Sequence, residues 1–425
     1  MENIKPEILI KIEKKYNLNL EKLIEFQEIM GFPQSYKVDE NNNVIEINLN
    51  KCKFSSLHQL RYIKTLKRLC LGGNNIQNIE PLYQLKELEY LDISNNRIED
   101  ISDLKQLSAL RYLNISNNRI YDISPIYDQL RNDLYLQADK NPMVYPSQNI
   151  SINRNGDVVE WFDNLWNYAN TKIEENLHTK EEVLDLGRCG ITDLSRFPLL
   201  FKCTHLKKLV LSNEWAIYEG EWDRETSKNN GLPNNIFNVP AEFSKLISLE
   251  ELFIGGDWKS RKNKVWNRWR IRTFAVFNKL INLKYLNLSN NLIQGNVNLT
   301  KLQQTQILHL NNNKITSITI SSNLENIKEL YLSNNYISDI FFLNKFPAVN
   351  TVDLHSNRIK TLLPIRELIE RVDISDSKWQ KHSINLTQNP LSNPPLEVVS
   401  QGNEYILAYF EQYQAEQSIK IKPTK

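Results

Sequence analysis

Residues 66–87 read LKRLCLGGNNIQNIEPLYQLKE, residues 88–109 read LEYLDISNNRIEDISDLKQLSA, and residues 110–131 read LRYLNISNNRIYDISPIYDQLR. The three stretches follow the pattern L-x-x-L-x-L-x-x-N-x-I-x-x-I-x-x-L-x-x-L, and each starts 22 residues after the one before. A sequence that repeats itself at a fixed period of this size builds a solenoid, in which each repeat stacks on its neighbours.

Each position of the repeat has a physical role that its residue type indicates. Leu69 and Leu71 alternate with other side chains, which predicts a short strand with both leucines on one face. Asn74 comes where this strand ends. Its side chain can bond backbone groups of the turn, so stacked asparagines form a ladder. Later apolar positions, such as Ile76 and Leu82, fill the interior from the returning segment.

The same spacing continues on both sides of these three repeats. Cys52 and Cys189 fill the asparagine position of two further units. The strict spacing resumes later in the chain, with a leucine or valine in each strand and an asparagine at each turn: Leu286, Leu308, Leu330 and Val352, and Asn291, Asn313, Asn335 and Asn357. We count roughly twelve units, some of them degenerate.

These residues identify the pattern as a leucine-rich repeat, and its length resembles the short class found in protein-phosphatase regulatory subunits. The resemblance implies an α/β solenoid, a horseshoe whose concave face is a parallel sheet. One repeat cannot bury its own apolar face, so the stacked neighbours supply the core.

Two segments outside the pattern divide the array. Residues 143–182 carry apolar side chains at helical spacing, such as Phe162 and Trp166, which predicts an amphipathic helix. The C-terminal segment is built alike, and we expect each helix to close a repeat block, because an open end exposes core. The predicted domains are a helical N-terminal cap at 1–43, repeat blocks at 44–142 and 183–395, a capping helix at 143–182, and a C-terminal capping helix and tail at 396–425.

The C-terminal segment carries a second, finer resemblance. It contains, in order, Asn389-Pro390-Leu391, Pro394-Pro395, Glu397, Val398-Val399 and Gln401-Gly402. This run resembles the end of the repeat domain in bacterial Roco proteins and related signalling proteins, where a GTPase or another effector domain follows. No such domain follows here. The resemblance therefore implies a sensing or scaffolding part whose effector is absent or encoded separately, and it carries over no catalytic residue.

Composition and charge exclude several classes of protein. The 425 residues include 52 basic and 50 acidic side chains, and this net charge of +2 excludes a histone-like nucleic-acid binder. No stretch approaches the ~18 apolar residues of a membrane helix, and the charged N-terminus does not resemble a secretion signal. The four cysteines form no C-x-x-C pair. We therefore expect a cytoplasmic protein that does not contact a membrane, and the resemblance to bacterial signalling proteins implies a bacterial one.

The concave face is the expected binding surface of such a horseshoe. Its side chains flank the buried strand leucines, in rows about 5 Å apart. Tyrosine suits protein contacts, because it offers a large contact area at little cost in rotamer freedom. Tyrosine also favours sheets for its own sake, and both interpretations stay open. The candidate residues are Tyr90, Asp92, Tyr112, Asn114, Tyr285, Asn287, His309, Tyr331 and Asp353.

A metal or catalytic site at His309, Asp353 and His355 is disfavoured by distance. His309 and Asp353 lie two repeats apart, so their backbones are about 10 Å apart, whereas zinc ligands lie ~2.0–2.2 Å from the ion. The sequence has no G-x-S-x-G motif and no Gly-rich phosphate loop. We predict a protein that is not an enzyme, with no metal, no cofactor and no catalytic residue.

Two insertions interrupt consecutive repeats, at 215–235 and 257–272. Both follow a strand, so we expect both to leave the solenoid at the same edge. The first is acidic and the second basic, and together they hold five of the eight tryptophans. Tryptophan and arginine dominate binding hot spots. The candidate residues are Trp215, Trp222, Trp258, Arg261, Lys262, Trp266, Arg268, Trp269 and Arg270.

Three interpretations of these insertions stay open. The basic loop grips an acidic protein surface, or residues 258–272 stack on single-stranded nucleic acid, or the two loops only fold onto each other. We favour a protein-binding scaffold or sensor, whose partner is a separately encoded signalling or defence effector. The alternative is the regulatory subunit of a phosphatase-type or other split enzyme.

Overall fold

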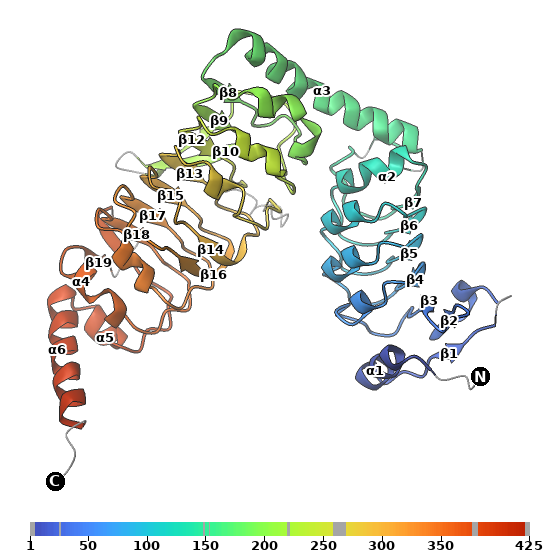
Figure 1. Ribbon diagram of the computed structural model, residues 1–425, viewed down its shortest axis with the longest axis horizontal. Coiled ribbons are helices and arrows are strands. Elements are labelled where there is room, and N and C mark those ends of the chain that lie inside the picture. Colours follow the sequence, from blue (N-terminus) through green and yellow to red (C-terminus); the bar gives the residue numbers. More distant parts are fainter. Residues whose placement is uncertain are drawn as a thin grey trace. The chain divides into compact units, whose positions relative to one another are not determined.

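The computed structural model describes residues 5–24, 27–147, 149–152, 154–218, 222–257, 269–375 and 381–420. The chain divides into two compact units, residues 1–165 and 166–425, which we call unit 1 and unit 2. The division falls inside helix α3 (Asn155–Thr179). In each unit, short strands stacked side by side form one face of the solenoid (Figure 1).

Unit 1 is built on a seven-stranded sheet in the order β1 to β7. From β3 onward the strands are parallel, and the repeats stay in step, so that Leu69 pairs with Leu91 and Leu91 with Leu113. The strands are β1 (Glu21–Lys22), β2 (Ser35–Val38), β3 (Val44–Asn48), β4 (Arg68–Cys70), β5 (Tyr90–Asp92), β6 (Tyr112–Asn114) and β7 (Tyr135–Gln137).

The N-terminal cap differs from the mostly helical one that we expected for residues 1–43. Its one α-helix among the described residues is α1 (Glu7–Tyr16), and the sheet is closed by β2, which runs antiparallel to β3. The physical reason lies in the backbone of β3. A flanking strand pairs its outward N–H and C=O groups, which a helix leaves unpaired.

Unit 2 contains a nine-stranded parallel sheet in the order β8-β9-β12-β13-β15-β17-β18-β20-β19. Its strands are β8 (Val183–Asp185), β9 (Lys208–Val210), β12 (Glu251–Phe253), β13 (Tyr285–Asn287), β15 (Ile307–His309), β17 (Glu329–Tyr331), β18 (Thr351–Asp353), β19 (Asp373–Ser375) and β20 (Ser383–Asn385). The first insertion forms an antiparallel hairpin of β10 (Glu214–Tyr218) and β11 (Trp222–Thr226).

The returning segments of the repeats are mostly 3₁₀ turns with short helices. The α-helices here are α2 (Tyr127–Arg131) and α4 (Arg366–Ile369). Two neighbouring repeats of unit 2 instead pair β14 (Gln294–Asn298) with β16 (Lys314–Thr319) as a small parallel sheet. Unit 2 ends in α5 (Leu396–Val399) and α6 (Asn403–Lys420). This is the leucine-rich-repeat solenoid that the sequence predicts.

The asparagine ladder has the bonds that the repeat requires. Asn96 Nδ2 donates to Ile93 O in its own repeat (3.1 Å) and to Leu71 O in the preceding one (3.0 Å). Asn96 Oδ1 accepts the N–H of Ile76 (3.0 Å). The same three bonds recur at Asn74, Asn118, Asn141, Asn313, Asn335, Asn357 and Asn389. Each ladder residue thus ties two repeats together.

The asparagine before the ladder position has a different task. Asn95 and Asn117 have φ values of 53° and 54°, and asparagine tolerates this left-handed conformation better than most residues. The pair NN in each repeat therefore combines one residue for the turn with one for the ladder. Cys52 and Cys189 take the ladder position in earlier repeats, each with its thiol facing a carbonyl two residues earlier.

Candidate functional site

An aromatic row lies on the concave face of unit 1. Tyr90 and Tyr112 stack with ring centres 4.2 Å apart and planes 4° apart, and Tyr112 stacks on Tyr135 at 5.4 Å. The guanidinium of Arg68 lies 5.0 Å from the Tyr90 ring at the other end. These four residues, which we call the open row, come from the same position of β4, β5, β6 and β7.

Hydrogen bonds align the tyrosines of the open row. Tyr90 donates to the Tyr112 hydroxyl, which donates to Gln137 Oε1 at 3.0 Å. Burial raises the pKa of both tyrosines, so both stay protonated at neutral pH. Tyr135 ends the row in the edge strand β7 and is 60% exposed. Its outer ring face is therefore available to a partner.

The neighbouring row of unit 1 serves the turns of the repeat. Asp92 accepts the N–H of Ser94 (2.9 Å) and Asn114 that of Ser116 (3.0 Å), each two residues on. Cys70 is buried in this row, and burial raises its pKa to about 12. Asn287 and Asp353 of unit 2 bond their turns in the same way. The four carboxylate and amide candidates thus have a structural role in the fold.

The concave face of unit 2 carries an aromatic row of a different kind. Phe253 stacks on Tyr285 at 4.6 Å, Tyr285 lies 5.4 Å from His309, and His309 stacks on Tyr331 at 4.2 Å. Here Asn287, His309 and Tyr331 are buried. We predicted them to be binding residues; in the conformation described they are packed within the protein, and a binding role for them stays a prediction.

The hairpin β10–β11 lies against this second aromatic row. We call the row, which consists of Phe253, Tyr285, His309 and Tyr331, the covered row. Trp215 is 8% exposed, its ring centre lies 5.0 Å from that of Phe253, and it packs with Val210 and Tyr285. Glu225 is its partner across the hairpin. Burial raises the pKa of Tyr285, and nearby carboxylates, that of Glu225 included, raise it further. An internal tryptophan thus occupies the concave face.

Polar contacts fix the returning end of this hairpin. Ser227 Oγ donates to the Asp185 carboxylate (2.9 Å), and Asn229 Nδ2 donates to Gly187 O (2.9 Å). Gly187 permits the close approach, because a Cβ there would lie 2.3 Å from Ser212 O. Asn234 then takes the ladder position, donating to Leu186 O and Leu211 O at 2.8 Å each. The chain therefore re-enters the repeat pattern at the position where the insertion interrupted it.

The second insertion contains residues that the structure buries. Trp269 is 0% exposed, and Arg270 donates its N–H to Ile236 O at 2.9 Å, as Arg97 does to Ile76 O. Trp269 therefore stands where a repeat has its ladder asparagine, and Arg270 is buried beside it. We predicted both to bind a partner; here both are buried, and a binding role for them stays a prediction. A ladder position faces the interior, whatever residue fills it.

The other predicted residues of the insertions are not placed by their side chains. Trp222 starts β11 and pairs with Tyr218, but only its backbone is described. Trp258, Arg261, Lys262, Trp266 and Arg268 lie outside the described residues.

His309 is held neutral by its surroundings. Its imidazole is stacked on Tyr331 and buried, and burial lowers its pKa to about 3. Asp353 lies further along the sheet, accepts a hydrogen bond from Asn385 (3.0 Å), and has a pKa raised by burial. Among the residues that the structure describes, no group of three His, Cys, Asp or Glu side chains is arranged to hold a metal ion.

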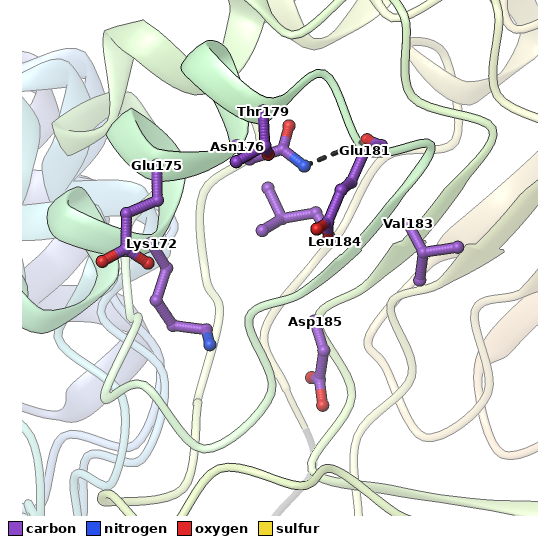
Figure 2. Close-up of a pocket in the computed structure, with 8 residues that line it drawn as sticks. All are labelled: Lys172, Glu175, Asn176, Thr179, Glu181, Val183, Leu184 and Asp185. Atoms are coloured by element: carbon purple, nitrogen blue, oxygen red, sulfur yellow. Dashed lines mark hydrogen bonds between the residues drawn. The ribbon is translucent and has the colours of Figure 1, made fainter.

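A cavity of about 320 Å³ lies in unit 2, between the end of α3 and β8. Figure 2 shows its lining, in which Lys172 and Glu175 of α3 face Asp185 of the edge strand. Asn176 is already bonded there, to Glu181 O (3.0 Å) and to the His205 ring (3.0 Å). The Asp185 carboxylate in the lining also accepts a hydrogen bond, from Ser227 Oγ (2.9 Å).

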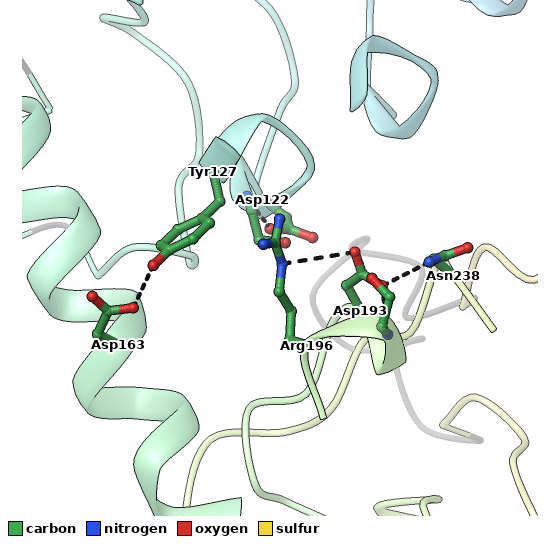
Figure 3. Close-up of polar contacts among 8 residues, drawn as sticks. Asp122, Tyr127, Asp163, Asp193, Arg196 and Asn238 are labelled. Atoms are coloured by element: carbon green, nitrogen blue, oxygen red, sulfur yellow. Dashed lines mark hydrogen bonds and ion pairs between the residues drawn. The ribbon is translucent and has the colours of Figure 1, made fainter. Parts of the chain in front are cut away.

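Figure 3 shows a contact of helix α3 within unit 1, together with polar contacts within unit 2. In unit 1, Tyr127 of α2 donates to Asp163. In unit 2, Asp193 accepts from Asn238 Nδ2 (2.7 Å) and lies 4.0 Å from Arg196 Nε, and the Arg196 guanidinium lies 5.7 Å from the Trp166 ring. Residues 143–182 thus contain the predicted helix, whose apolar side includes Phe162 and Trp166.

Sequence families match the repeats of both units. The family of Leucine Rich repeats (2 copies) matches residues 64–106, 303–345 and 325–367, and the Leucine Rich Repeat family matches residues 109–130. With the ladder and the parallel sheets, these matches make the chain a leucine-rich-repeat protein. The finer resemblance of residues 389–402 to Roco proteins stays a prediction.

Two of the solved structures that match this chain come from bacteria. An internalin from Listeria monocytogenes is 20% identical over 82% of this chain and 78% of its own, with a TM-score of 0.34. A leucine-rich-repeat protein from Leptospira interrogans is 20% identical over 92% and 89%, with a TM-score of 0.33. At these values neither structure indicates what this chain binds. No curated protein is significantly similar in sequence.

None of the helices within the described ranges is both long and apolar enough to cross a membrane.

Proposed function

We propose that this chain is a protein-binding scaffold that recognises its partner through the open row of unit 1. The exposure of Tyr135, at the end of a stacked and hydrogen-bonded row, is the observation that carries the proposal. Rigid aromatic side chains on a fixed sheet give contact area without a large loss of rotamer entropy. The solenoid supplies the rigidity, since its ladder ties each repeat to the next.

The partner that we propose is a separately encoded signalling or defence effector in the cytoplasm. The resemblance of residues 389–402 to the end of Roco repeat domains supports an effector, and four buried, free cysteines suit a reducing compartment. A regulatory subunit of a split enzyme would use the same face. The identity of the bound protein, effector or catalytic subunit, separates the two.

A comparative pull-down tests this proposal. Tagged full-length protein is recovered from cells of the source organism as wild type, as Tyr135→Ala, and as Tyr62→Ala. Tyr62 is the matched control, because it is 58% exposed but lies in a 3₁₀ turn outside the sheet. A partner kept by wild type and Tyr62→Ala but lost by Tyr135→Ala supports the open row. Equal recovery by all three contradicts it.

A further inference from the structure

The charges of the two concave faces differ in one respect. In unit 2 the basic side chains along the sheet are paired, Lys208 with Glu251 (2.8 Å) and Lys381 with Glu329 (3.2 Å). In unit 1, Arg68 forms no ion pair with any described residue. Glu46, the neighbour of Arg68 on the adjacent strand, forms an ion pair with Lys37 (3.5 Å). The Arg68 guanidinium, at one end of the open row, therefore has no ion-pair partner among the described residues.

The covered row shows what fits such a surface. An aromatic ring from outside the sheet, that of Trp215, packs on Phe253 and Tyr285 and closes the row. The open row has the same chemistry in Tyr90, Tyr112 and Tyr135, but lacks an internal ring on Tyr135, whose ring remains exposed. The covered row draws mainly on the strand position two residues after that of the open row, so it shows only that a ring from outside the sheet can pack on aromatic side chains of this concave face.

We infer that the open row binds an extended peptide segment of the partner that carries an aromatic side chain and a carboxylate. The aromatic ring stacks on the outer face of Tyr135, and the carboxylate pairs with the Arg68 guanidinium. Arginine favours carboxylates, because its planar donors bind both oxygens. This inference rests on the proposed function and names the chemistry of its partner.

The spacing of the two groups follows from the sheet. Arg68 and Tyr135 are three strands apart in the sheet order, which is about 14 Å at the usual strand separation, and a stacked ring adds about 4 Å. An extended chain advances ~3.3 Å per residue. The acidic and aromatic residues of the partner should therefore lie about five residues apart.

Nucleic acid fits this surface less well than a peptide does. Stacked tyrosines with an arginine also suit single-stranded bases. However, the Asp92 carboxylate lies close enough to raise the pKa of both Tyr90 and Tyr112, and it would repel a run of phosphates. A peptide with a single carboxylate, which pairs with Arg68, meets less of that repulsion than a chain of phosphates does.

Peptide selection on the immobilised full-length chain tests the inference. The probe is a displayed library of random 12-residue peptides, and the best sequences are resynthesised for affinity measurement. We expect enriched peptides with an acidic and an aromatic residue about five apart. Arg68→Gln and Tyr135→Ala should each weaken them at least about tenfold, while Tyr135→Phe should not, because the ring and not the hydroxyl is required.

The opposite face provides matched controls. Arg61 lies 5.1 Å over Tyr62 in a 3₁₀ turn outside the sheet, so the same residue types meet there without a row. Arg61→Gln and Tyr62→Ala should each leave the affinity unchanged within about twofold. Circular dichroism of every variant verifies that it folds.

The outcomes separate the two proposals. Peptides that depend on Tyr135 but carry no acidic residue, or that bind Arg68→Gln as well as wild type, overturn the inference and leave the proposed function intact. Peptides that ignore Tyr135→Ala, or no enrichment at all, overturn both. A labelled 12-nucleotide thymidine strand that binds in a Tyr135-dependent way, in place of peptides, overturns the peptide as the ligand class.

Discussion

The concave faces of the two units start from the same repeat and end in different states. In unit 1 the row from Arg68 to Tyr135 has one unpaired charge and one exposed ring. On the concave face of unit 2, Trp215 packs on Phe253 and Tyr285, Lys208 is paired with Glu251, and His309 is neutral. The difference teaches that a strand position alone does not define a binding surface. The segment after the strand decides whether that position meets a partner or the protein itself.

The largest expected effect tests whether the asparagine ladders hold the repeats of the two units together equally well, although the concave faces differ. Asn96→Ala and Asn313→Ala each remove three buried hydrogen bonds that join two repeats. We expect each to lower the free energy of unfolding of its own unit by about 3–4 kcal/mol. Urea denaturation gives the size, and hydrogen exchange read by mass spectrometry assigns it to a unit.

The control is Asn164→Ala on the exposed side of α3, which should change the free energy of unfolding by at most about 0.5 kcal/mol. A large loss at Asn96 with none at Asn313 would mean that the two stacks are not held together in the same way.

The second prediction concerns the ring that closes the covered row. Trp215→Ala should lower the stability of unit 2 by about 3 kcal/mol, since it leaves a cavity beside Phe253. Trp215→Phe should retain most of the stability. Hydrogen exchange should increase at β9, β12 and β13 and stay unchanged in unit 1. Unchanged protection of these three strands would indicate that the hairpin only rests on the sheet.

The third prediction uses the buried histidine, which has no counterpart in the open row. The pKa of His309 is about 3 in the folded chain and ~6.5 when unfolded. Between these values the unfolded state binds the extra proton, so stability falls as the pH drops below 6.5. From pH 7.5 to 5, wild type should lose about 2 kcal/mol more than His309→Phe.

Denaturation curves of both proteins at the two pH values measure this difference. Equal pH dependence would mean that His309 is accessible to solvent in the folded protein. The covered row would then not be closed.

The smallest expected effect concerns the open row, where loss of a ring should cost little stability, in contrast to the loss of Trp215. Tyr135→Ala should change the stability of unit 1 by at most about 0.5 kcal/mol, because the side chain is largely exposed. Thermal unfolding measures it. A loss of 2 kcal/mol or more would place Tyr135 in the core and remove the contrast between the rows.

Much of the repeat framework can be predicted from the sequence, because the regular spacing of the repeats is visible in it. The strand leucines, the ladder asparagines and the cysteine substitutes at Cys52 and Cys189 all stand where the pattern predicts. These positions interact only with the repeats before and after, so a regular spacing is enough to place them.

The sites were less predictable, because they depend on contacts between distant segments. Trp269 reads as part of a basic loop, but the backbone bond of Arg270 to Ile236 shows that the repeat resumes at that tryptophan. The spacing of the repeat does not predict where a long insertion ends. The burial of Tyr331 and His309 was equally hidden, since both stand at the strand position of Asn114, which is half exposed.

The detour between Leu211 and Asn234 has a consequence for how such a chain tolerates change. Asn234 bonds Leu211 O across 23 residues with the geometry that Asn96 uses across three. Sequence can therefore be added or exchanged at this turn of the solenoid while the register of the later repeats is preserved. Doubling the length of a flexible loop costs only about 0.6 kcal/mol. New recognition surfaces can thus be grafted here at little cost to the scaffold.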